Sequence, residues 1–233
     1  MKSSVLNGLL LATGMTIAST TFVGAHGDVK PQAVDTAGLP ENGEEWLTEN
    51  PYRTEAVGQD VWLKAVEIGA SGYNQNCARC HGLEVVSGGL APDLRFLEAE
   101  EYGDEWYVER FRDGYTQNGT TKMPAFGELL GQDAAWAIRT YIETRPDSDA
   151  MEAVVDELKE LRDLIAGYAE NATGADADAL KARLTVISES IETLSGAPVA
   201  DSVAFRAANL IDGTPEAYRA AAETLTIGLP ATH

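Results

Sequence analysis

The sequence predicts an all-α protein with an extended N-terminal arm and a C-terminal helical extension. Apolar residues recur at helical spacing through residues 58–146, and that region shows no pairs of alternating strands. Two long apolar stripes with a helical period follow within residues 147–233. A chain of 233 residues is long enough for one core with an appendage, or for two small domains.

The first segment, residues 1–25, has the pattern of a secretory signal peptide. A lysine near the start precedes an apolar run, and small residues follow, which places cleavage after Ala25. Thr and Gly interrupt the run, which is shorter than the roughly 20 apolar residues that span a bilayer. We therefore expect a periplasmic protein without stable membrane insertion.

Acidic residues dominate the composition, and the formal net charge is −20. Such a surface is not attracted to nucleic acid or to anionic lipid. The acids either form a solvated face or speed the arrival of a basic redox partner, an effect that salt would weaken.

The next segment, residues 26–57, is rich in Pro, Gly and acids and lacks helical periodicity. It is predicted to be an extended arm that lies over the following domain. Trp46 and Leu47 are its expected anchors.

The region 58–146 is predicted to form one small helical domain. A helix starts at Asp60 and runs straight into Cys77, a second covers residues 99–113, and a third covers residues 133–143. The stretch 113–131 between the last two helices is rich in turn residues.

The region 147–233 is predicted to be an acidic helical extension. Residues 171–178, "NATGADAD", provide a hinge that would let two helices fold back as an αα-hairpin. Thr214 as N-cap and Pro215 at the first helical position predict a last helix to about residue 226. The first stripe consists of Met151, Val154, Val155, Leu158, Leu161, Leu164 and Ile165, and the second of Leu180, Leu184, Ile187, Ile191 and Leu194.

The stretch "NQNCARCHG", residues 74–82, holds both cysteines of the chain. A disulfide between Cys77 and Cys80 would restrict little chain entropy, and a redox-active pair would need a βαβ pattern that is missing here. A structural zinc site needs four ligands, whereas His26 and His233 lie at the chain ends. The residues that the chain offers therefore disfavour both the disulfide and the zinc site.

The remaining interpretation is C-x-x-C-H, the attachment site of a c-type haem. Each thiol forms a thioether to one vinyl group of the porphyrin, and the two-residue spacer lets both reach the same macrocycle. His81 then binds the iron from the proximal side. We expect one haem c, covalently attached through Cys77 and Cys80.

The second axial ligand decides between electron transfer and chemistry at an open iron site. Met123, in "TKMPAFG", lies in a turn-rich stretch that would let its thioether reach the iron, with Pro124 stiffening the loop. Met151 starts an apolar stripe and is expected to fill the core. His26 would be a solvated terminus, so Met123 is the predicted ligand.

Residues 58–146 contain four motifs, "GASGYNQNCARCHG", "APDL", "MPAF" and "WAIRTYI". With these motifs the region resembles a class I cytochrome c. The resemblance implies that the helix with Gly69 and Tyr73 crosses the last helix of the domain. It also implies that the carbonyl of Pro92 accepts the Nδ1 proton of His81, which orients the imidazole ring. Tyr73 and Pro92 therefore join the expected haem site.

A narrower resemblance covers residues 26–145. The arm, the haem motif and the Met loop are similar to periplasmic cytochromes that accept electrons from quinoprotein alcohol dehydrogenases, which contain pyrroloquinoline quinone, in ethanol oxidation. This resemblance implies such a dehydrogenase as donor and a downstream cytochrome or terminal oxidase as acceptor. Residues 147–233 have no recognised counterpart.

The leading hypothesis is a one-electron carrier rather than an enzyme. The alternatives are a haem sensor or enzyme, if Met123 is displaceable, and a haem subunit or tethering module of a larger oxidoreductase complex. A partner is expected to dock on an apolar rim around the exposed haem edge, formed by Val85, Val86, Gly88, Gly89, Leu90 and Ala125.

Overall fold

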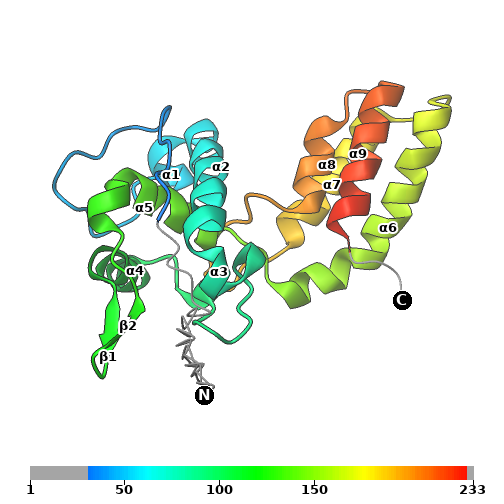
Figure 1. The fold of residues 1–233 in the computed structure, drawn as a ribbon. Coiled ribbons are helices and arrows are strands. Elements are labelled where there is room, and N and C mark those ends of the chain that lie inside the picture. The colour runs from blue at the N-terminus through cyan, green and yellow to red at the C-terminus, as the bar shows by residue number, and fades with distance from the viewer. Residues whose placement is uncertain (1–30, 230–233) are drawn as a thin grey trace, which may run out of the picture. The chain divides into compact units, whose positions relative to one another are not determined.

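The computed structural model describes residues 31–229, and their buried apolar side chains form two clusters. Figure 1 shows the helices and strands that carry them. We call residues 31–145 the N-terminal lobe and residues 148–229 the C-terminal bundle. The predicted signal peptide, His26 and His233 lie outside the described residues. The domain boundary at 146/147 stays a prediction, whereas the mostly helical fold is confirmed.

The N-terminal lobe consists of helices, two short 3₁₀ turns and one small hairpin. Its longest helix, α2, has the bounds that the apolar spacing predicts to within one residue. The elements are α1 (Thr54–Val57), α2 (Gln59–Asn76), α3 (Ala78–His81), the turns Leu83–Val85 and Leu94–Phe96, α4 (Glu101–Asp113), β1 (Tyr115–Gln117), β2 (Thr120–Met123) and α5 (Gly127–Glu143).

Helices α2 and α5 cross at Gly69, as the resemblance implied. A Cβ atom at this position would lie 2.0 Å from the carbonyl oxygen of Ala137 and 2.9 Å from Cβ of Tyr141. Only glycine allows the two backbones to approach so closely. The Tyr73 and Tyr141 rings pack beside this crossing with their centroids 5.4 Å apart.

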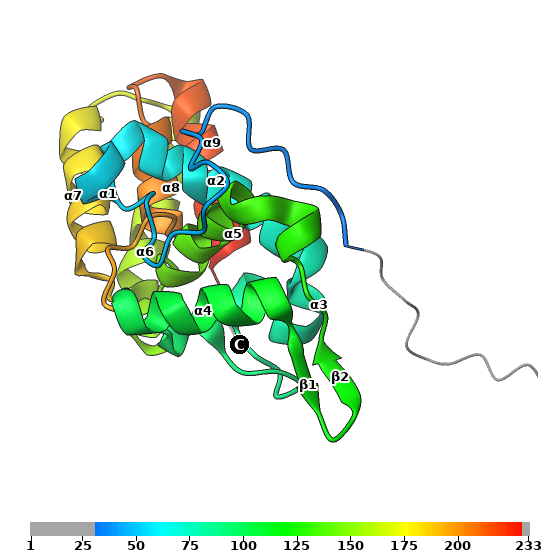
Figure 2. The same ribbon diagram turned by 90° about the vertical axis from the view of Figure 1, so that its left-hand side faces the viewer.

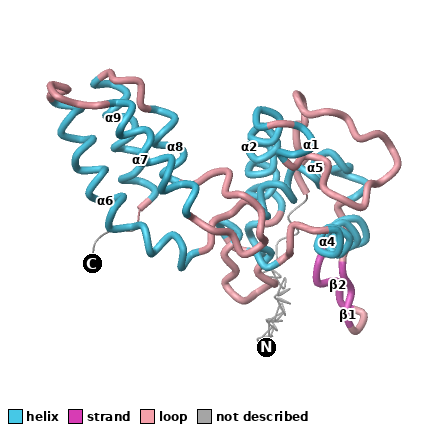
Figure 3. The backbone as a smooth tube through the Cα atoms, turned by 180° about the vertical axis from the view of Figure 1, so that it is seen from behind, coloured by secondary structure: helices cyan, strands magenta, loops and turns pink. Residues whose placement is uncertain are grey.

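The prediction that residues 58–146 lack strand pairs was wrong. Strands β1 and β2 form an antiparallel hairpin, the only strands among the described residues (Figure 3). Asn118 and Gly119 connect them with φ angles of 51° and 74°. Two consecutive left-handed residues are what a tight hairpin turn requires, and Asn-Gly is its strongest sequence signal.

The predicted arm, residues 26–57, lacks regular structure from residue 31 to 53 and winds over the lobe (Figure 2), but its last four residues form helix α1, which the prediction missed. Trp46 is an anchor, with its ring 6.3 Å from that of Phe111. Leu47 is not, because its side chain is exposed and only its backbone N–H bonds to Gln132. The fully buried Tyr52 is the anchor that replaces it.

A buried charge network ties the arm to α4 and α5. The Arg53 guanidinium lies 2.8 Å from the Asp104 carboxylate and 2.9 Å from that of Glu143. Arg139, which is fully buried, pairs with Asp104 at 2.8 Å, and the Asn50 amide donates to Glu143 at 3.1 Å. Buried charges are tolerated because each one is paired and hydrogen-bonded.

The C-terminal bundle contains four helices among the described residues, which run alongside one another (Figure 1). Side-chain hydrogen bonds cap the N-terminus of each helix. The N-cap residues, all of types that are favoured at this position, are Asp147, Asp176, Ser202 and Thr214. The helices are α6 (Ser148–Glu170), α7 (Ala177–Ser190), α8 (Val203–Leu210) and α9 (Pro215–Gly228).

The packing of the bundle differs in detail from the predicted hairpin. Helix α6 packs mainly against α9 rather than against its sequence neighbour α7, and α8 packs on both α7 and α9. Leu164, assigned to the first apolar stripe, is exposed, whereas Leu158, Leu161 and Ile165 are fully buried.

A segment that we call the return segment, residues 191–202, joins α7 to α8 and packs on the N-terminal lobe. The hydroxyl of Ser195 donates to the carbonyl of Glu143, and the Ser195 carbonyl accepts from the Ala99 N–H at 2.9 Å. Ala200 is buried in the core of the N-terminal lobe. The extension is therefore attached to the lobe at more than its point of chain connection.

Candidate functional site

The end of α2 positions the cysteine motif. Cys77 caps α2, its N–H bonding to the Tyr73 carbonyl at 2.8 Å, and the chain then turns into the four-residue helix α3. The His81 N–H bonds back to the Cys77 carbonyl at 3.0 Å. One helical turn thus places both thiols and the imidazole in a single short segment.

The imidazole of His81 is buried and oriented by a carbonyl group. Its Nδ1 lies 2.9 Å from the carbonyl oxygen of Pro92, the hydrogen bond that the resemblance implied. A carbonyl can only accept, so Nδ1 carries the proton and Nε2 keeps its lone pair. Burial is the largest influence on the ring and lowers its pKa, which favours the neutral form that a metal ligand needs.

A tight turn after His81 fixes where α3 ends. Gly82 has a φ of 87°, and a Cβ atom there would lie 1.9 Å from the carbonyl oxygen of Val86. The buried Tyr73 hydroxyl donates to the Gly82 carbonyl at 2.8 Å. Tyr73 therefore holds the turn behind the histidine in place.

Cys77 and Cys80 are not joined to each other in this structure. Burial, followed by the charge of Cys80, raises the pKa of Cys77 to about 12. A thiol with this pKa is protonated at neutral pH, whereas metal binding and disulfide exchange use the thiolate. Among residues 31–229, no cluster of His, Cys, Asp and Glu could hold a metal ion.

Met123 is the last residue of β2, not a loop residue as expected. The hairpin holds its backbone, and its partly buried side chain packs on the same apolar core as Cys77. Gly114, with φ of 69°, lets the chain pass beside it, since a Cβ there would lie 2.5 Å from the Met123 carbonyl oxygen. A short paired strand, rather than Pro124 alone, restricts this residue.

The expected apolar rim is partly present. Val86, Leu90 and Ala125 are exposed, but Val85 is fully buried and cannot contact a partner. Leu83, with 73% of its side chain exposed, takes its place beside the motif.

Two buried nitrogen atoms stand out that sequence reasoning missed. Nε1 of Trp136 and Nε of Arg145 are buried without a hydrogen-bond partner among the described residues. The sequence signals only a helix at Trp136 and a break near Arg145, so no local pattern could have identified either atom.

The residues fit a covalently attached haem. His81 offers Nε2, the thiols of Cys77 and Cys80 stand at the spacing that thioether formation needs, and Met123 supplies a soft sulfur atom next to the same core. The Trp136 N–H is an additional unpaired donor in the N-terminal lobe. One imidazole, one thioether and two thiols favour haem over a bare metal ion, which would need further side-chain ligands.

Comparisons with known proteins support this interpretation. Residues 64–142 match the family described as cytochrome C oxidase, cbb3-type, subunit III. Cytochrome c550 of Pseudomonas aeruginosa strain PAO1 is 52% identical over 143 residues, which cover 61% of this chain and 95% of the cytochrome.

More distant relatives include both free cytochromes and haem-containing enzymes. Cytochrome c6 of Euglena gracilis is 33% identical over 79 residues, covering 33% of this chain and 88% of the cytochrome. The quinohemoprotein alcohol dehydrogenase ADH IIB of Pseudomonas putida is 31% identical over 103 residues, covering 43% of this chain but 14% of the enzyme. No solved structure matches the chain.

Three observations point to the same family. The match covers 95% of cytochrome c550, the chain contains the C-x-x-C-H motif, and helices α2 and α5 cross in close contact. Among residues 31–229, every helix is too short or too polar to cross a bilayer. The chain belongs to the class I c-type cytochromes, which carry covalently bound haem c and transfer electrons.

Proposed function

We propose that the protein is a periplasmic one-electron carrier that accepts electrons from a quinoprotein alcohol dehydrogenase and passes them to the respiratory chain. Its haem c is attached through Cys77 and Cys80, and His81 and Met123 are the axial ligands. The observation that carries the haem site is the hydrogen bond from His81 Nδ1 to the Pro92 carbonyl, which presents Nε2 to the iron.

Haem c, when bound, supplies a one-electron couple, and the residues of the chain prepare its surroundings. Pro92 holds His81 in the tautomer that presents Nε2, and the Tyr73 hydroxyl fixes the turn that follows. The β hairpin restricts the backbone of Met123, which would hold its thioether in place as an iron ligand. Cys77 and Met123 both pack against the apolar core that contains Phe111 and Phe126.

The identity of the donor is supported by relatives and by charge. Two of the similar proteins are named quinohemoprotein alcohol dehydrogenases, which contain a matching segment within their own chains. The net charge of −20 favours a donor with a basic docking surface. The exposed side chains Leu83, Val86 and Leu90, next to the haem-binding motif, provide an apolar surface for that contact.

The test is to mix this protein with a reduced quinoprotein alcohol dehydrogenase and to follow haem reduction by absorbance. The Debye length falls from about 30 Å at 0.01 M salt to about 10 Å at 0.1 M, so we expect fast reduction that slows as salt is added. Ascorbate serves as a control reductant. Reduction by ascorbate but not by the dehydrogenase at either salt concentration would refute the proposed donor.

A further inference from the structure

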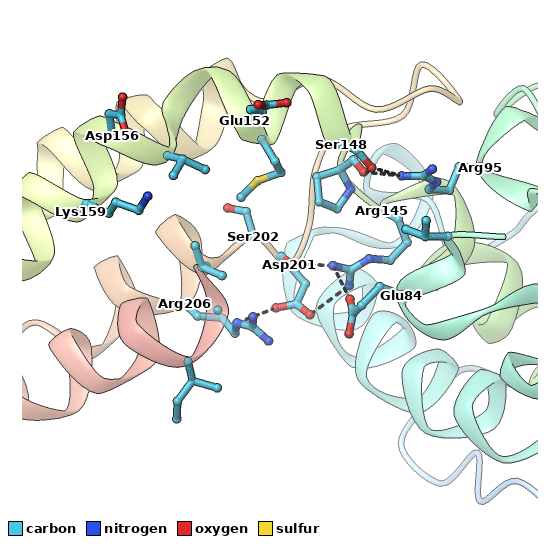
Figure 4. Close-up of a pocket in the computed structure, with 17 residues that line it drawn as sticks. Glu84, Arg95, Arg145, Ser148, Glu152, Asp156, Lys159, Asp201, Ser202 and Arg206 are labelled. Carbon is cyan, nitrogen blue, oxygen red and sulfur yellow. Dashed lines mark hydrogen bonds and ion pairs between the residues drawn. The ribbon is translucent and has the colours of Figure 1, made fainter. Parts of the chain in front are cut away.

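Arg145 lies where the N-terminal lobe meets the C-terminal bundle, and its side chain is buried (Figure 4). One terminal nitrogen lies 3.0 Å from the Glu84 carboxylate, and the other lies 3.2 Å from that of Asp201. Glu84 follows the haem-binding motif, whereas Asp201 belongs to the return segment. One guanidinium therefore joins the motif to the extension.

The guanidinium makes further contacts, because the nitrogen beside Glu84 also donates to the backbone carbonyl of Asp201 at 3.2 Å. It stacks 4.9 Å from the centroid of the Tyr141 ring, and its Nε has no partner among the described residues. It borders a groove of about 1260 Å³ that both the lobe and the bundle line. The position of the charge is therefore determined by the two carboxylates, the Asp201 backbone carbonyl and the Tyr141 ring.

The loop that Glu84 belongs to is strained. Glu84 and Val85 have φ angles of 54° and 66°, although neither is glycine. A left-handed conformation is unfavourable for an ordinary residue, and a β-branched residue adopts it rarely. Such a conformation persists only where surrounding contacts impose it. Here those contacts include the complete burial of Val85, the hydrogen bond from Tyr73 to the Gly82 carbonyl, and the ion pair of Glu84, whose side chain is itself exposed.

We propose that Asp201, acting through Arg145 and Glu84, positions the strained loop 82–86 behind the haem-binding histidine. Residues 147–233 thereby set the stability of this loop and the reduction potential of the haem. In one point the inference rests on the proposed function, since it takes His81 as the iron ligand.

The direction of the effect on the potential follows from charge. Arg145 carries one positive charge that Glu84 and Asp201 share, and Asp201 also pairs with Arg206 at 3.4 Å. Removing the charge of Asp201 leaves the site more positive. Because the oxidised haem carries one more positive charge than the reduced haem, the reduced state is then favoured and the potential rises.

The test uses the full-length haem-loaded protein with Asp201→Asn. We expect amide hydrogen exchange in residues 82–87 to become several-fold faster and the reduction potential to rise. Glu152→Gln is the matched control, because this exposed acid lines the same groove but takes part in no ion pair seen in the described residues. It should change neither the exchange nor the potential appreciably.

Glu84→Gln interrupts the same contact without touching the bundle, which keeps the proposal testable if Asp201→Asn folds poorly. Both acids act through one guanidinium, so the double variant should exchange no faster than Glu84→Gln alone. Unchanged exchange in both single variants, or effects that simply add, would overturn the inference. Failure of His81 ligation would appear separately, in the absorption spectrum of the wild-type protein.

Discussion

Gly69→Ala tests the helix crossing on which the N-terminal lobe depends. The new methyl group would lie 2.0 Å from the Ala137 carbonyl oxygen and 2.6 Å from its carbonyl carbon, both of which are backbone atoms of α5. To restore an ordinary contact of about 3.5 Å, the two helices would have to separate by about 1.5 Å. No side-chain rotation can relieve this clash.

The net cost follows from two opposing effects. Overpacking costs about 1–3 kcal/mol, and the upper end applies because backbone atoms clash; the higher helix propensity of Ala returns up to about 1 kcal/mol. We therefore expect Gly69→Ala to lower the free energy of unfolding by about 2 kcal/mol. Gly167→Ala is the matched control, because nothing lies within 4 Å of a Cβ at this exposed position in α6. It should stabilise the protein slightly.

The assay is urea unfolding followed by tryptophan fluorescence. All four tryptophans of the chain lie in the N-terminal lobe, so this signal reports on the lobe that contains the crossing. If Gly69→Ala proves as stable as the wild type, the close α2–α5 approach is not a feature of the folded protein.

Three further substitutions test the arm, the hairpin and the turn behind His81. Arg53→Met leaves Asp104 and Glu143 with one cation between them and should cost about 3–5 kcal/mol in unfolding free energy near neutral pH. Burial already raises the pKa of Glu143, and its folded state therefore binds a proton more readily than the unfolded state. The loss in Arg53→Met should accordingly shrink as the pH falls from about 7 to about 5, and urea titrations that show an equal or larger loss at the lower pH contradict this. In Gly119→Ala the new methyl group meets no atom within 4 Å, but the residue must keep a φ of 74°. Calorimetry should therefore show a loss of about 1 kcal/mol in unfolding free energy from backbone strain alone. An unchanged melting temperature would argue against a left-handed turn at this position. Tyr73→Phe removes the donor to the Gly82 carbonyl and should cost about 1–3 kcal/mol in urea unfolding, whereas no loss would mean that the turn is held by other contacts.

The helices and the haem motif were predictable because their signals are local. The apolar spacing from Asp60 onward defines α2, and Thr214 with Pro215 marks the start of α9. The hairpin was missed because its strands are short and exposed on both faces, which leaves no alternation of apolar residues. The dipeptide Asn118-Gly119 was the available signal.

Two other features follow from tertiary contacts alone. Helix α8 is eight residues long and buries mainly alanines, such as Ala204 and Ala207, which give a weak apolar stripe. The buried positions of Arg139 and Asp104 could not be predicted either, because charged residues within a helix are typical of a solvated surface. Their pairing depends on how the arm, α4 and α5 come together.

The central claim is that His81 and Met123 are the two axial ligands of one haem c. The most direct measurement is the absorption spectrum of the wild-type protein beside that of Met123→Ala, in the oxidised state and in the reduced state with carbon monoxide. The account predicts a near-infrared sulfur-to-iron band in the wild type that disappears in the variant, and carbon monoxide binding only in the variant. A wild-type protein that lacks this band and binds carbon monoxide readily would contradict the account.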